Sequence, residues 1–314
     1  MTKVACIGEC MIELREADGG LYSRGYGGDT LNTAIYLARL GTEVDYVTAL
    51  GDDPLSDEML AGWAAEGVGT RQVLRLPGKL PGIYMIQTDD KGERRFFHWR
   101  ESSAARSLMD LPESQAIFRS LESYDLVYLS AITLSLYGAD GRARLIAALG
   151  RARQRGARVA FDTNFRARGW PDLDIASAAY CDAFEAADIV LASTEDLLPL
   201  FAGESNEGMM ARISSPEVVL KLSEPASMLR FNGVVHEVRA EPVTTPVVDT
   251  TAAGDSFAAA YIAARLTGAD PIEAARAGHR LAGVVVCHPG AIIPRSAMPA
   301  KTPSEPATAH RAST

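Results

Sequence analysis

The sequence predicts an α/β protein with a doubly wound, mostly parallel central sheet and helices on both faces. The first observation is an alternation of short apolar runs with helical stretches. The runs lie at 126–130, 158–162 and 188–191, and the helical stretches at 141–155 and 175–187. This βαβα rhythm is typical of a parallel sheet whose ligands bind at the carboxyl ends of the strands. The second observation is a β-hairpin pattern at 82–100, which does not fit the rhythm and predicts a small additional sheet.

Composition narrows the class of protein further. Of 314 residues, 47% are hydrophobic, which is enough for a large core in one domain over residues 1–300. The net charge of −9 and the pI near 5.2 argue against nucleic acid or an acidic membrane surface as a partner. No apolar run has membrane-spanning length, and the start reads as a strand rather than a signal peptide. Four cysteines without a disulfide framework fit a reducing cytoplasm.

The amino-terminal part begins with a buried strand at 4–8 and a second strand at 9–14. Next comes the segment Gly27-Gly28-Asp29-Thr30-Leu31-Asn32, whose glycines free the backbone before a helix that runs to Leu40. Asp29 or Thr30 is expected to cap this helix. Because Asp29 and Asn32 are one helical turn apart, both side chains can face one ligand. The alternative is a capped loop without a ligand.

The middle of the chain predicts a strand at 44–50, a helix at 57–66 and the hairpin, with its turn at 89–92. Tyr84, His98 and Arg100 alternate on the hairpin strands, so that their side chains can point the same way. Surface hairpins also carry such residues without any ligand.

Polar residues follow the predicted parallel strands. Asp162-Thr163-Asn164-Phe165-Arg166 stands at one strand end, where polar groups either serve a ligand or cap a turn. Glu195 and Asp196 follow the next strand, at a position where acids are also favoured by a helix start. A strand at 218–221, a hairpin at 227–238 and a helix from Asp270 to about Cys287 complete the fold. The Pro-, Ser- and Thr-rich residues 301–314 are expected to be disordered.

The stretch at 247–257 carries the strongest chemical signal. Two valines lead into the small residues Thr250 to Gly254, and a helix follows. Unpaired N–H groups and the helix dipole make such a helix start an anion site. Asp255 places a carboxylate inside it, which is suitable for a general base beside a phosphate. The alternative is an ordinary acidic residue in a first helical turn.

Asp249-Thr250-Thr251-Ala252-Ala253-Gly254-Asp255 resembles the signature of the ribokinase-like (PfkB) sugar kinases. The resemblance implies ATP and Mg²⁺ as cofactors, with room for a monovalent cation. It further implies that Ala252, Ala253 and Gly254 form the anion hole for the transferring phosphoryl group, and that Asp255 deprotonates the acceptor hydroxyl. Ala252 departs from the pattern, because most members have glycine there. Its methyl group restricts the backbone but leaves the N–H in place.

The resemblance also assigns the remaining site residues. Those expected to bind the substrate are Gly27, Gly28, Asp29, Asn32, Tyr84, His98, Arg100, Arg166 and Asp255. Those expected to bind the nucleotide are Asn164, Lys221, Ser223, Thr250, Ala252 and Gly254. Glu195 and Asp196 are both candidates for holding magnesium through water, since the register is uncertain by one residue. Ser223 replaces a glycine in a turn close to the nucleotide, which puts nucleotide affinity in doubt.

Within the family, the chain is most similar to a sugar-acid branch, up to Pro299. The sequence motifs that show this resemblance are Gly8 to Leu14, Gly27 to Thr33, Asp249 to Phe257 and Gly290 to Arg295. A sugar acid needs a counter-charge, and Arg100 and Arg166 are suitable partners for its carboxylate. The family's lid corresponds to about 9–24 and 80–103, and it often forms a homo-oligomer interface.

Three alternatives remain open. A fructokinase or ribokinase of the same family would act on a neutral sugar, which would not need both arginines. A non-catalytic ligand-binding relative is suggested by the altered turn at 222–226, but Asp255 speaks against it. A dinucleotide-binding dehydrogenase would suit the alternating fold, but the Gly-x-Gly-x-x-Gly fingerprint does not follow any early strand.

Overall fold

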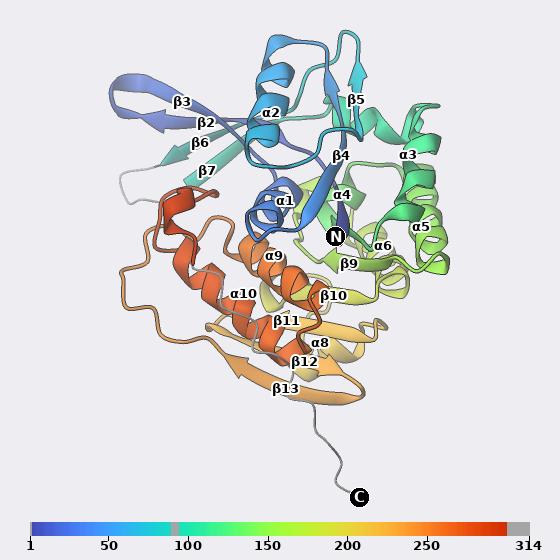
Figure 1. Ribbon diagram of the computed structural model, residues 1–314, viewed down its shortest axis with the longest axis vertical. Helices are drawn as coiled ribbons and strands as arrows, with labels where there is room; N and C mark the ends of the chain where they lie inside the picture. Colours follow the sequence, from blue (N-terminus) through green and yellow to red (C-terminus); the bar gives the residue numbers. More distant parts are fainter. Residues whose placement is uncertain (1, 89–93, 300–314) are drawn as a thin grey trace, which may run out of the picture.

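The central sheet runs through the whole of the computed structural model, which describes residues 2–88 and 94–299 (Figure 1). Its nine strands lie in the order β13-β12-β11-β10-β9-β8-β1-β4-β5, parallel from β11 to β5, with β12 and β13 antiparallel at one edge. The strands are β1 Lys3–Ile7, β4 Glu43–Gly51, β5 Val73–Leu76, β8 Leu126–Ser130, β9 Arg158–Asp162, β10 Ile189–Ser193, β11 Glu217–Lys221, β12 Ala226–Phe231 and β13 Val234–Arg239. Because the chain goes from β1 to β4 in one direction and returns beside β1 with β8, a topological switch point lies between β1 and β8. The carboxyl ends near such a point are where doubly wound sheets bind ligands.

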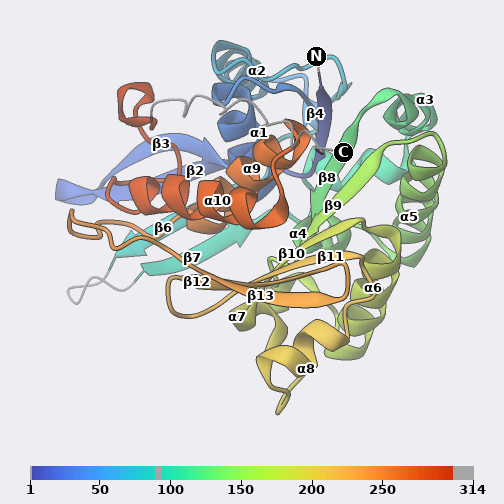
Figure 2. The same ribbon diagram turned by 60° about the horizontal axis from the view of Figure 1, so that its bottom comes forward.

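Helices cover both faces of this sheet, as Figure 2 shows. The α-helices are α1 Asp29–Arg39, α2 Pro54–Ala65, α3 Ser114–Ser120, α4 Ala131–Ser135, α5 Ala139–Gln154, α6 Leu173–Ala186, α7 Thr194–Leu197, α8 Asn206–Ala211, α9 Ala253–Leu266 and α10 Pro271–Val285. Short 3₁₀ helices are η1 Asp18–Gly20, η2 Ala104–Asp110, η3 Leu121–Ser123, η4 Ala167–Gly169 and η5 Arg295–Ala297. One buried cluster joins the sheet to α3–α8, and a second joins the opposite face to α1, α2, α9 and α10. The predicted doubly wound architecture is confirmed.

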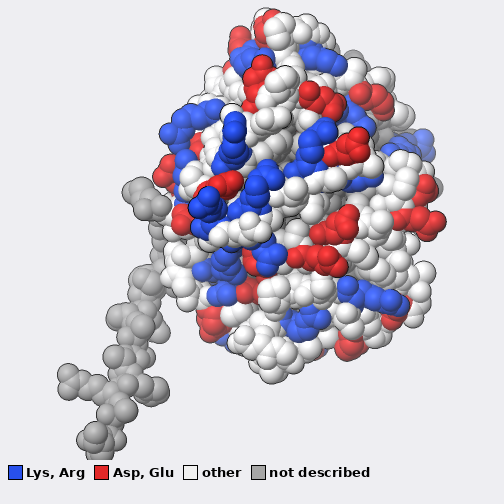
Figure 3. Space-filling view, turned by 90° about the vertical axis from the view of Figure 1, so that its right-hand side faces the viewer, with Lys and Arg blue, Asp and Glu red and all other residues white. Residues whose placement is uncertain are grey.

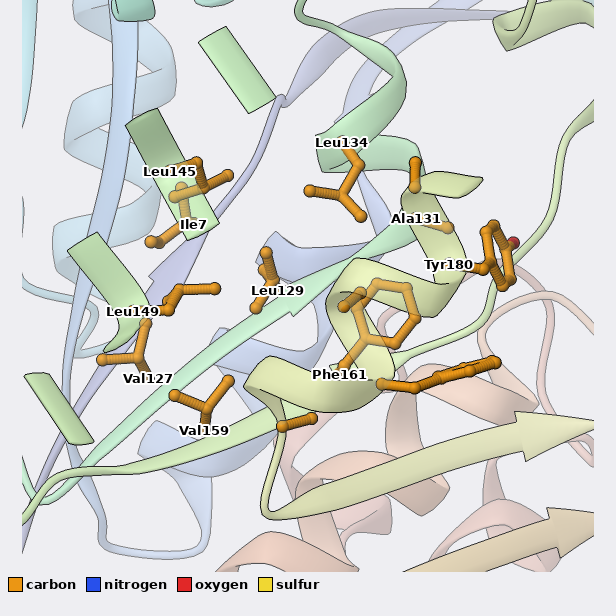
Figure 4. Close-up of a cluster of buried hydrophobic side chains, with 14 of the residues drawn as sticks. Ile7, Val127, Leu129, Ala131, Leu134, Leu145, Leu149, Val159, Phe161 and Tyr180 are labelled. Carbon is orange, nitrogen blue, oxygen red and sulfur yellow. The ribbon is translucent and has the colours of Figure 1, made fainter. Parts of the chain in front are cut away.

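The alternation of side chains along a strand explains the two clusters. In β1, Ala5 and Ile7 point into one cluster, and Val4 and Cys6 into the other. Figure 4 shows the first cluster, in which Val127 and Leu129 of β8 meet Leu145 and Leu149 of α5. Strands buried on both faces appear in the sequence as the continuous apolar runs that predicted them.

A second sheet of four strands stands apart from the first in the order β3-β2-β6-β7. Its strands are β2 Met11–Ala17, β3 Leu21–Gly27, β6 Ile83–Thr88 and β7 Arg94–Trp99. The outer pairs are antiparallel, and β2 and β6 are parallel. This confirms the predicted small sheet, although β3 reaches further than the expected strand region of 9–24. The predicted turn at 89–92 and the tail at 301–314 lie outside the described residues.

One local prediction was wrong, and one strand was missed. Neither Asp29 nor Thr30 caps α1: the cap residue is Gly28, which has extended backbone and makes no side-chain capping bond. Asp29 lies inside the first turn, where its carboxylate accepts a hydrogen bond from Asn164 instead. The strand β5 was missed because only four residues pair there, at the sheet edge, and none of them is fully buried.

The face that carries α3 and α5 mixes charges of both signs (Figure 3). Arginines of α5 pair with acidic side chains of other segments. Arg144 lies 3.3 Å from Asp110, and Arg153 lies 2.8 Å from Asp188. This face therefore has interspersed charges and not a single basic stripe. No helix in residues 2–88 and 94–299 is both long and apolar enough to cross a membrane.

Candidate active site

Asp255 lies in the first turn of α9 and faces α1 across the surface of the sheet. Its Oδ2 accepts a 2.8 Å hydrogen bond from Asn32 Nδ2, although the two residues are 223 positions apart in the chain. The Asp255 carbonyl oxygen lies 3.3 Å from Thr33 Oγ1. Packing of α1 on α9 thus joins the segment expected to bind sugar to the expected general base.

The strand ends contribute the other side of the same cluster. Asp162 ends β9, and Asn164 two residues later donates from Nδ2 to Asp29 Oδ2 over 2.8 Å. Lys221 ends β11, and its Nζ lies 3.3 Å from Asp162 Oδ2. Residues predicted for substrate and nucleotide therefore meet at the carboxyl edge of the parallel sheet, as the strand order requires.

Negative charge dominates this cluster. The pKa of Asp255 is raised to about 7, mainly by burial and also by the nearby carboxylates of Asp29 and Asp162, while the hydrogen bond from Asn32 and the charge of Lys221 oppose the shift. Burial likewise raises the pKa of Asp162, against the effect of Lys221. A carboxylate with a pKa near the working pH is well suited to accept a proton.

The closeness of these buried carboxylates should lower the free energy of unfolding of the protein. Because the pKa of Asp255 is raised in the folded chain, the folded state binds a proton more readily than the unfolded state between about pH 4 and about pH 7. The contribution of Asp255 to the free energy of unfolding therefore falls as pH rises through that window. We expect Asp255→Asn to raise the free energy of unfolding by about 4 kcal/mol at about pH 8, since the pKa is raised by about 3 units at about 1.36 kcal/mol each, and by less at about pH 5. Urea unfolding of both proteins at both pH values measures this, and equal effects at the two values would contradict the raised pKa.

The predicted anion hole begins with a strained residue. Ala252 is the cap residue of α9 and has φ 60° and ψ 17°, in the left-handed region. The N–H of Ala253 donates to the Thr250 carbonyl over 3.2 Å. Within the described part of the chain, the N–H groups of Ala252 and Gly254 make no hydrogen bond. Two of the three predicted donors are thus available to an anion, while the third closes a turn.

Replacing the strained alanine tests the backbone conformation. Left-handed backbone costs a non-glycine residue about 1–2 kcal/mol, and glycine loses about 0.5–1 kcal/mol in chain entropy. We expect Ala252→Gly to raise the free energy of unfolding by up to about 1 kcal/mol. The matched control is Ala253→Gly, which places glycine inside the helix and should only destabilise. A loss of stability in both variants would show that the methyl group of Ala252 is needed for packing.

The loop before α9 is anchored by a residue that the sequence analysis did not single out. Asp249 is buried and accepts hydrogen bonds from the N–H groups of Thr251 and Gly290, both 2.9 Å long. A Cβ built on Gly254 would lie 3.4 Å from Lys221 Nζ, so that the lysine is beside the helix start. Thr250 is exposed next to it. Lys221, the two free N–H groups and the exposed Thr250 therefore lie at the start of α9.

The altered turn at 222–226 is compatible with this arrangement. The N–H of Leu222 donates to Ala226 O over 2.9 Å, and Ser223 is exposed. Among the described residues other than glycine, only Asn232 and Ala252 have left-handed backbone. The turn therefore does not need a glycine for its conformation.

The two acidic candidates for a metal differ in their surroundings. Asp196 turns inward: its Oδ2 accepts a 3.0 Å hydrogen bond from Thr163 Oγ1, and its Oδ1 accepts a 2.9 Å bond from the N–H of Phe165. Glu195 is exposed. Arg166 is also exposed, and its Nη1 lies 3.6 Å from Asp196 Oδ1. In residues 2–88 and 94–299 no three His, Cys, Asp or Glu side chains are grouped to hold a metal ion.

On the small sheet, the three predicted residues have partners that the sequence analysis missed. Tyr84 pairs with His98 across β6 and β7, with their rings stacked 5.9 Å apart, so these two face the same way as predicted. The hydroxyl of Tyr84 donates to Glu13. Arg100 follows β7 and forms an ion pair with the buried Glu9. Both glutamates lie in the segment Gly8 to Leu14, which in the sequence served only as a mark of resemblance.

The profile of the pfkB family of carbohydrate kinases matches residues 1–298. The chain belongs to this family. Among relatives, 2-dehydro-3-deoxygluconokinase of Dickeya dadantii (strain 3937) is 42% identical over 306 residues, covering 95% of this chain and 98% of that protein. The solved 2-dehydro-3-deoxygluconokinase of Thermotoga maritima is 25% identical with a TM-score of 0.80, covering 93% of this chain and 96% of that one. A fructokinase from Xylella fastidiosa solved with bound ATP has the same fold, with a TM-score of 0.81 at 22% identity and 95% of each chain covered.

The regions that match the family include the residues around Asp255. The carbohydrate-kinase match extends across both sheets and includes α9 with Asp255. The likeness to solved structures likewise covers nearly the whole chain. The doubly wound fold and the small sheet inferred from the sequence are therefore features that this chain shares with known kinases.

Proposed function

We propose that the protein transfers the γ-phosphoryl group of ATP to the terminal hydroxyl of 2-dehydro-3-deoxy-D-gluconate and forms its 6-phosphate. The observation that carries the proposal is the position of Asp255, hydrogen-bonded to Asn32 of the sugar segment at the start of a helix with two free N–H groups. The relatives named for this activity, at 42% identity over nearly the whole chain, support the choice of substrate.

The reaction needs only a general base and a few groups that stabilise negative charge. Asp255 accepts the proton of the substrate hydroxyl, and that oxygen attacks the γ-phosphorus while the bond to the β-phosphate oxygen breaks, so that ADP leaves. The N–H groups of Ala252 and Gly254, with Lys221 beside them, would stabilise charge on the transferred group. Ala253 contributes by closing the turn that holds these donors.

Nucleotide binding is assigned to the segments that follow β9 and β11 and precede α9. Asn164 and Ser223 follow the ends of β9 and β11, and Thr250 precedes α9. The exposed Val243, Val247 and Val248 offer apolar surface for a base. The carboxylates of Asp196 and Glu195 fit Mg²⁺ held through water, because this ion prefers oxygen ligands and keeps several waters. Asp196 and Glu195 would hold the ion through water, where it would supply positive charge against that of the phosphates. A monovalent cation stays a prediction from the family resemblance.

The substrate is assigned to the side that faces the small sheet. Gly27 and Gly28 bring the chain to Asp29 and Asn32, whose oxygen and nitrogen atoms suit sugar hydroxyls. Tyr84 and His98 form a wall, and Arg100 and Arg166 provide positive charge for the substrate carboxylate. A neutral sugar, as in the fructokinase relatives, is the second candidate, because the same fold carries that activity.

The small sheet is also assigned as a lid and a homo-oligomer interface. Strand alternation puts Tyr84, His98 and Phe96 on one face, and Phe97 and Trp99 on the other. Phe97 is 42% exposed and Trp99 is 56% exposed. Exposed aromatic residues on one sheet face are typical of a protein–protein interface.

This interface gives a testable prediction. We expect the native protein to be a dimer, and the double variant Phe97→Ser with Trp99→Ser to be a monomer with a retained main-body fold, because the interface loses its aromatic contacts. Sedimentation velocity measures the outcome. Leu173→Ser, which changes an exposed apolar residue on α6, is the control and should stay dimeric. A native monomer, or a dimeric double variant, would contradict the assignment.

The cysteines support a reducing compartment such as the cytoplasm. All four are free: Cys6 and Cys10 are buried, and Cys181 and Cys287 reach the surface at least in part. Burial raises the pKa of the Cys6 thiol, which makes it an inert core residue.

A coupled assay of ADP release tests the function. Purified protein is given ATP and Mg²⁺ with 2-dehydro-3-deoxygluconate, its galactonate-derived epimer, fructose or ribose. We expect kcat/KM for the gluconate-derived acid to exceed that for either neutral sugar by at least about a hundredfold. Preference for fructose or ribose would favour the second candidate, and no ADP release with any sugar would favour a non-catalytic protein.

A further inference from the structure

All four chain crossings between the two sheets pass beside Glu9. The first crossing contains Glu9 itself, between β1 and β2. After β3, a Cβ built on Gly28 would lie 2.2 Å from the Glu9 carbonyl oxygen. Before β6, a Cβ built on Gly82 would lie 3.2 Å from Glu9 Oε1. The fourth crossing follows β7 and contains Arg100 and Ser103.

The side chain of Glu9 is buried in this junction. Its exposed fraction is 1%, and that of Arg100 is 17%. One carboxylate oxygen, Oε2, forms the ion pair with Arg100 Nη2, and the other, Oε1, accepts a hydrogen bond from Ser103 Oγ. A buried carboxylate of this kind needs its partners, because removal of one partner leaves an uncompensated charge.

The pair leaves part of Arg100 available to a ligand. The Arg100 side chain is 17% exposed, so that part of it remains accessible while Nη2 is held by Glu9; its buried Nε makes no hydrogen bond with any described residue. The guanidinium group is planar, so that a carboxylate held at one Nη fixes the direction of the remaining N–H groups. Glu9 therefore determines where Arg100 can donate, and its backbone lies against Gly28, directly before Asp29.

We propose that Glu9 is a positioning residue for the substrate carboxylate: it acts through Arg100 and fixes the guanidinium where the small sheet joins the main body. The inference rests on the proposed function, since it takes Arg100 as a ligand of the sugar acid. Glu9 itself is assigned no contact with the substrate. Its negative charge is useful only while Arg100 is present, because an unpaired carboxylate there would repel a sugar acid.

The first experiment separates substrate binding from nucleotide binding. We expect Glu9→Gln to raise KM for 2-dehydro-3-deoxygluconate by at least about tenfold and to leave KM for ATP within about twofold. Glu9→Asp retains the charge at a shorter reach and should give an intermediate KM. Glu9→Asp also replaces Glu9→Gln as the test variant if Glu9→Gln is too unstable to assay. An unchanged sugar KM in both variants would overturn the proposal.

The second experiment tests whether Glu9 acts through Arg100. If it does, adding Glu9→Gln to Arg100→Ala should lower the sugar-acid KM relative to Arg100→Ala alone, by about threefold or more, because it removes the unpaired carboxylate. The sign of the Glu9→Gln effect thus reverses with the background. Losses that add in the double variant would mean that Glu9 has an independent role, and the proposal would fall.

A matched control shows whether loss of any ion pair changes the sugar KM. Glu66 is bonded to Arg39 over 2.8 and 2.9 Å, and the exposed fractions of these side chains are 22% and 5%. Glu66→Gln should lower the melting temperature without changing the sugar KM. A rise in the sugar KM comparable to that of Glu9→Gln would show that the effect is structural. Failure of the proposed function would be distinct, because the native protein would then not phosphorylate the sugar acid at all.

Discussion

Asp255→Asn should lose about a hundredfold to ten-thousandfold in kcat while it keeps the fold and the affinity for sugar. General-base assistance is typically worth that much, or roughly 3–5 kcal/mol of barrier. The substitution is nearly isosteric, and the amide oxygen can still accept the hydrogen bond from Asn32. Only the ability to accept the hydroxyl proton is lost.

The pH dependence of the native protein belongs to the same test. With the pKa of Asp255 raised to about 7, kcat/KM should fall about tenfold per pH unit below that value. Asp45→Asn is the control, since it changes another buried carboxylate, which pairs with Lys3 over 3.2 Å and lies on β4. It should lower stability and leave kcat nearly unchanged. If Asp255→Asn retained more than about a tenth of the native kcat, Asp255 would not be the base.

Removal of a substrate arginine should have the second large effect. A carboxylate left without its partner in a closed site costs of order 2–5 kcal/mol. We therefore expect Arg166→Ala or Arg100→Ala to raise KM for 2-dehydro-3-deoxygluconate by at least about 30-fold. A neutral sugar, if it is phosphorylated, should lose much less from the same change. Arg166 is 61% exposed, so part of it can reach a ligand although its Nη1 donates to Phe165 O over 2.6 Å, whereas Arg100 is already held by Glu9.

This prediction is tested by measuring kcat/KM for the sugar acid and for the neutral sugar in each arginine variant. Arg144→Ala is the control, because Arg144 is an exposed arginine on α5 and pairs with Asp110 away from the carboxylate cluster. It should change neither value. Equal losses for acid and neutral sugar in Arg166→Ala would mean that this arginine serves the nucleotide or the fold, and the sugar-acid assignment would have to be given up.

Much of the fold could be predicted because the information is local. The strands β8 to β11 are short apolar runs, and the small residues before α9 mark a helix start that binds anions. The strand order then implies that Asp162 and Lys221 share an edge, which the structure confirms. Asn32 and Asp29 were identified by their spacing on one helical turn, and both reach the cluster.

Other features could not be predicted because they depend on contacts between distant segments. The partner of Asp29 is Asn164, 135 positions away, and Asp29 lies inside the first turn of α1 instead of capping it. The ion pair of Glu9 with Arg100 joins two junctions of the small sheet and has no local pattern. The left-handed backbone of Ala252 is unfavourable for alanine and so is opposite to what residue preference suggests.

Identification of the product tests the central claim most directly. Native protein is incubated with ATP, Mg²⁺ and 2-dehydro-3-deoxygluconate, and the phosphorylated carbon is located by phosphorus–carbon coupling in NMR spectra. We predict a single product with the phosphate on C6, and none when Asp255→Asn replaces the native protein over the same time. Absence of a phosphorylated sugar acid with the native protein, or a phosphate on another carbon, would contradict the account of Asp255 as the base for the terminal hydroxyl.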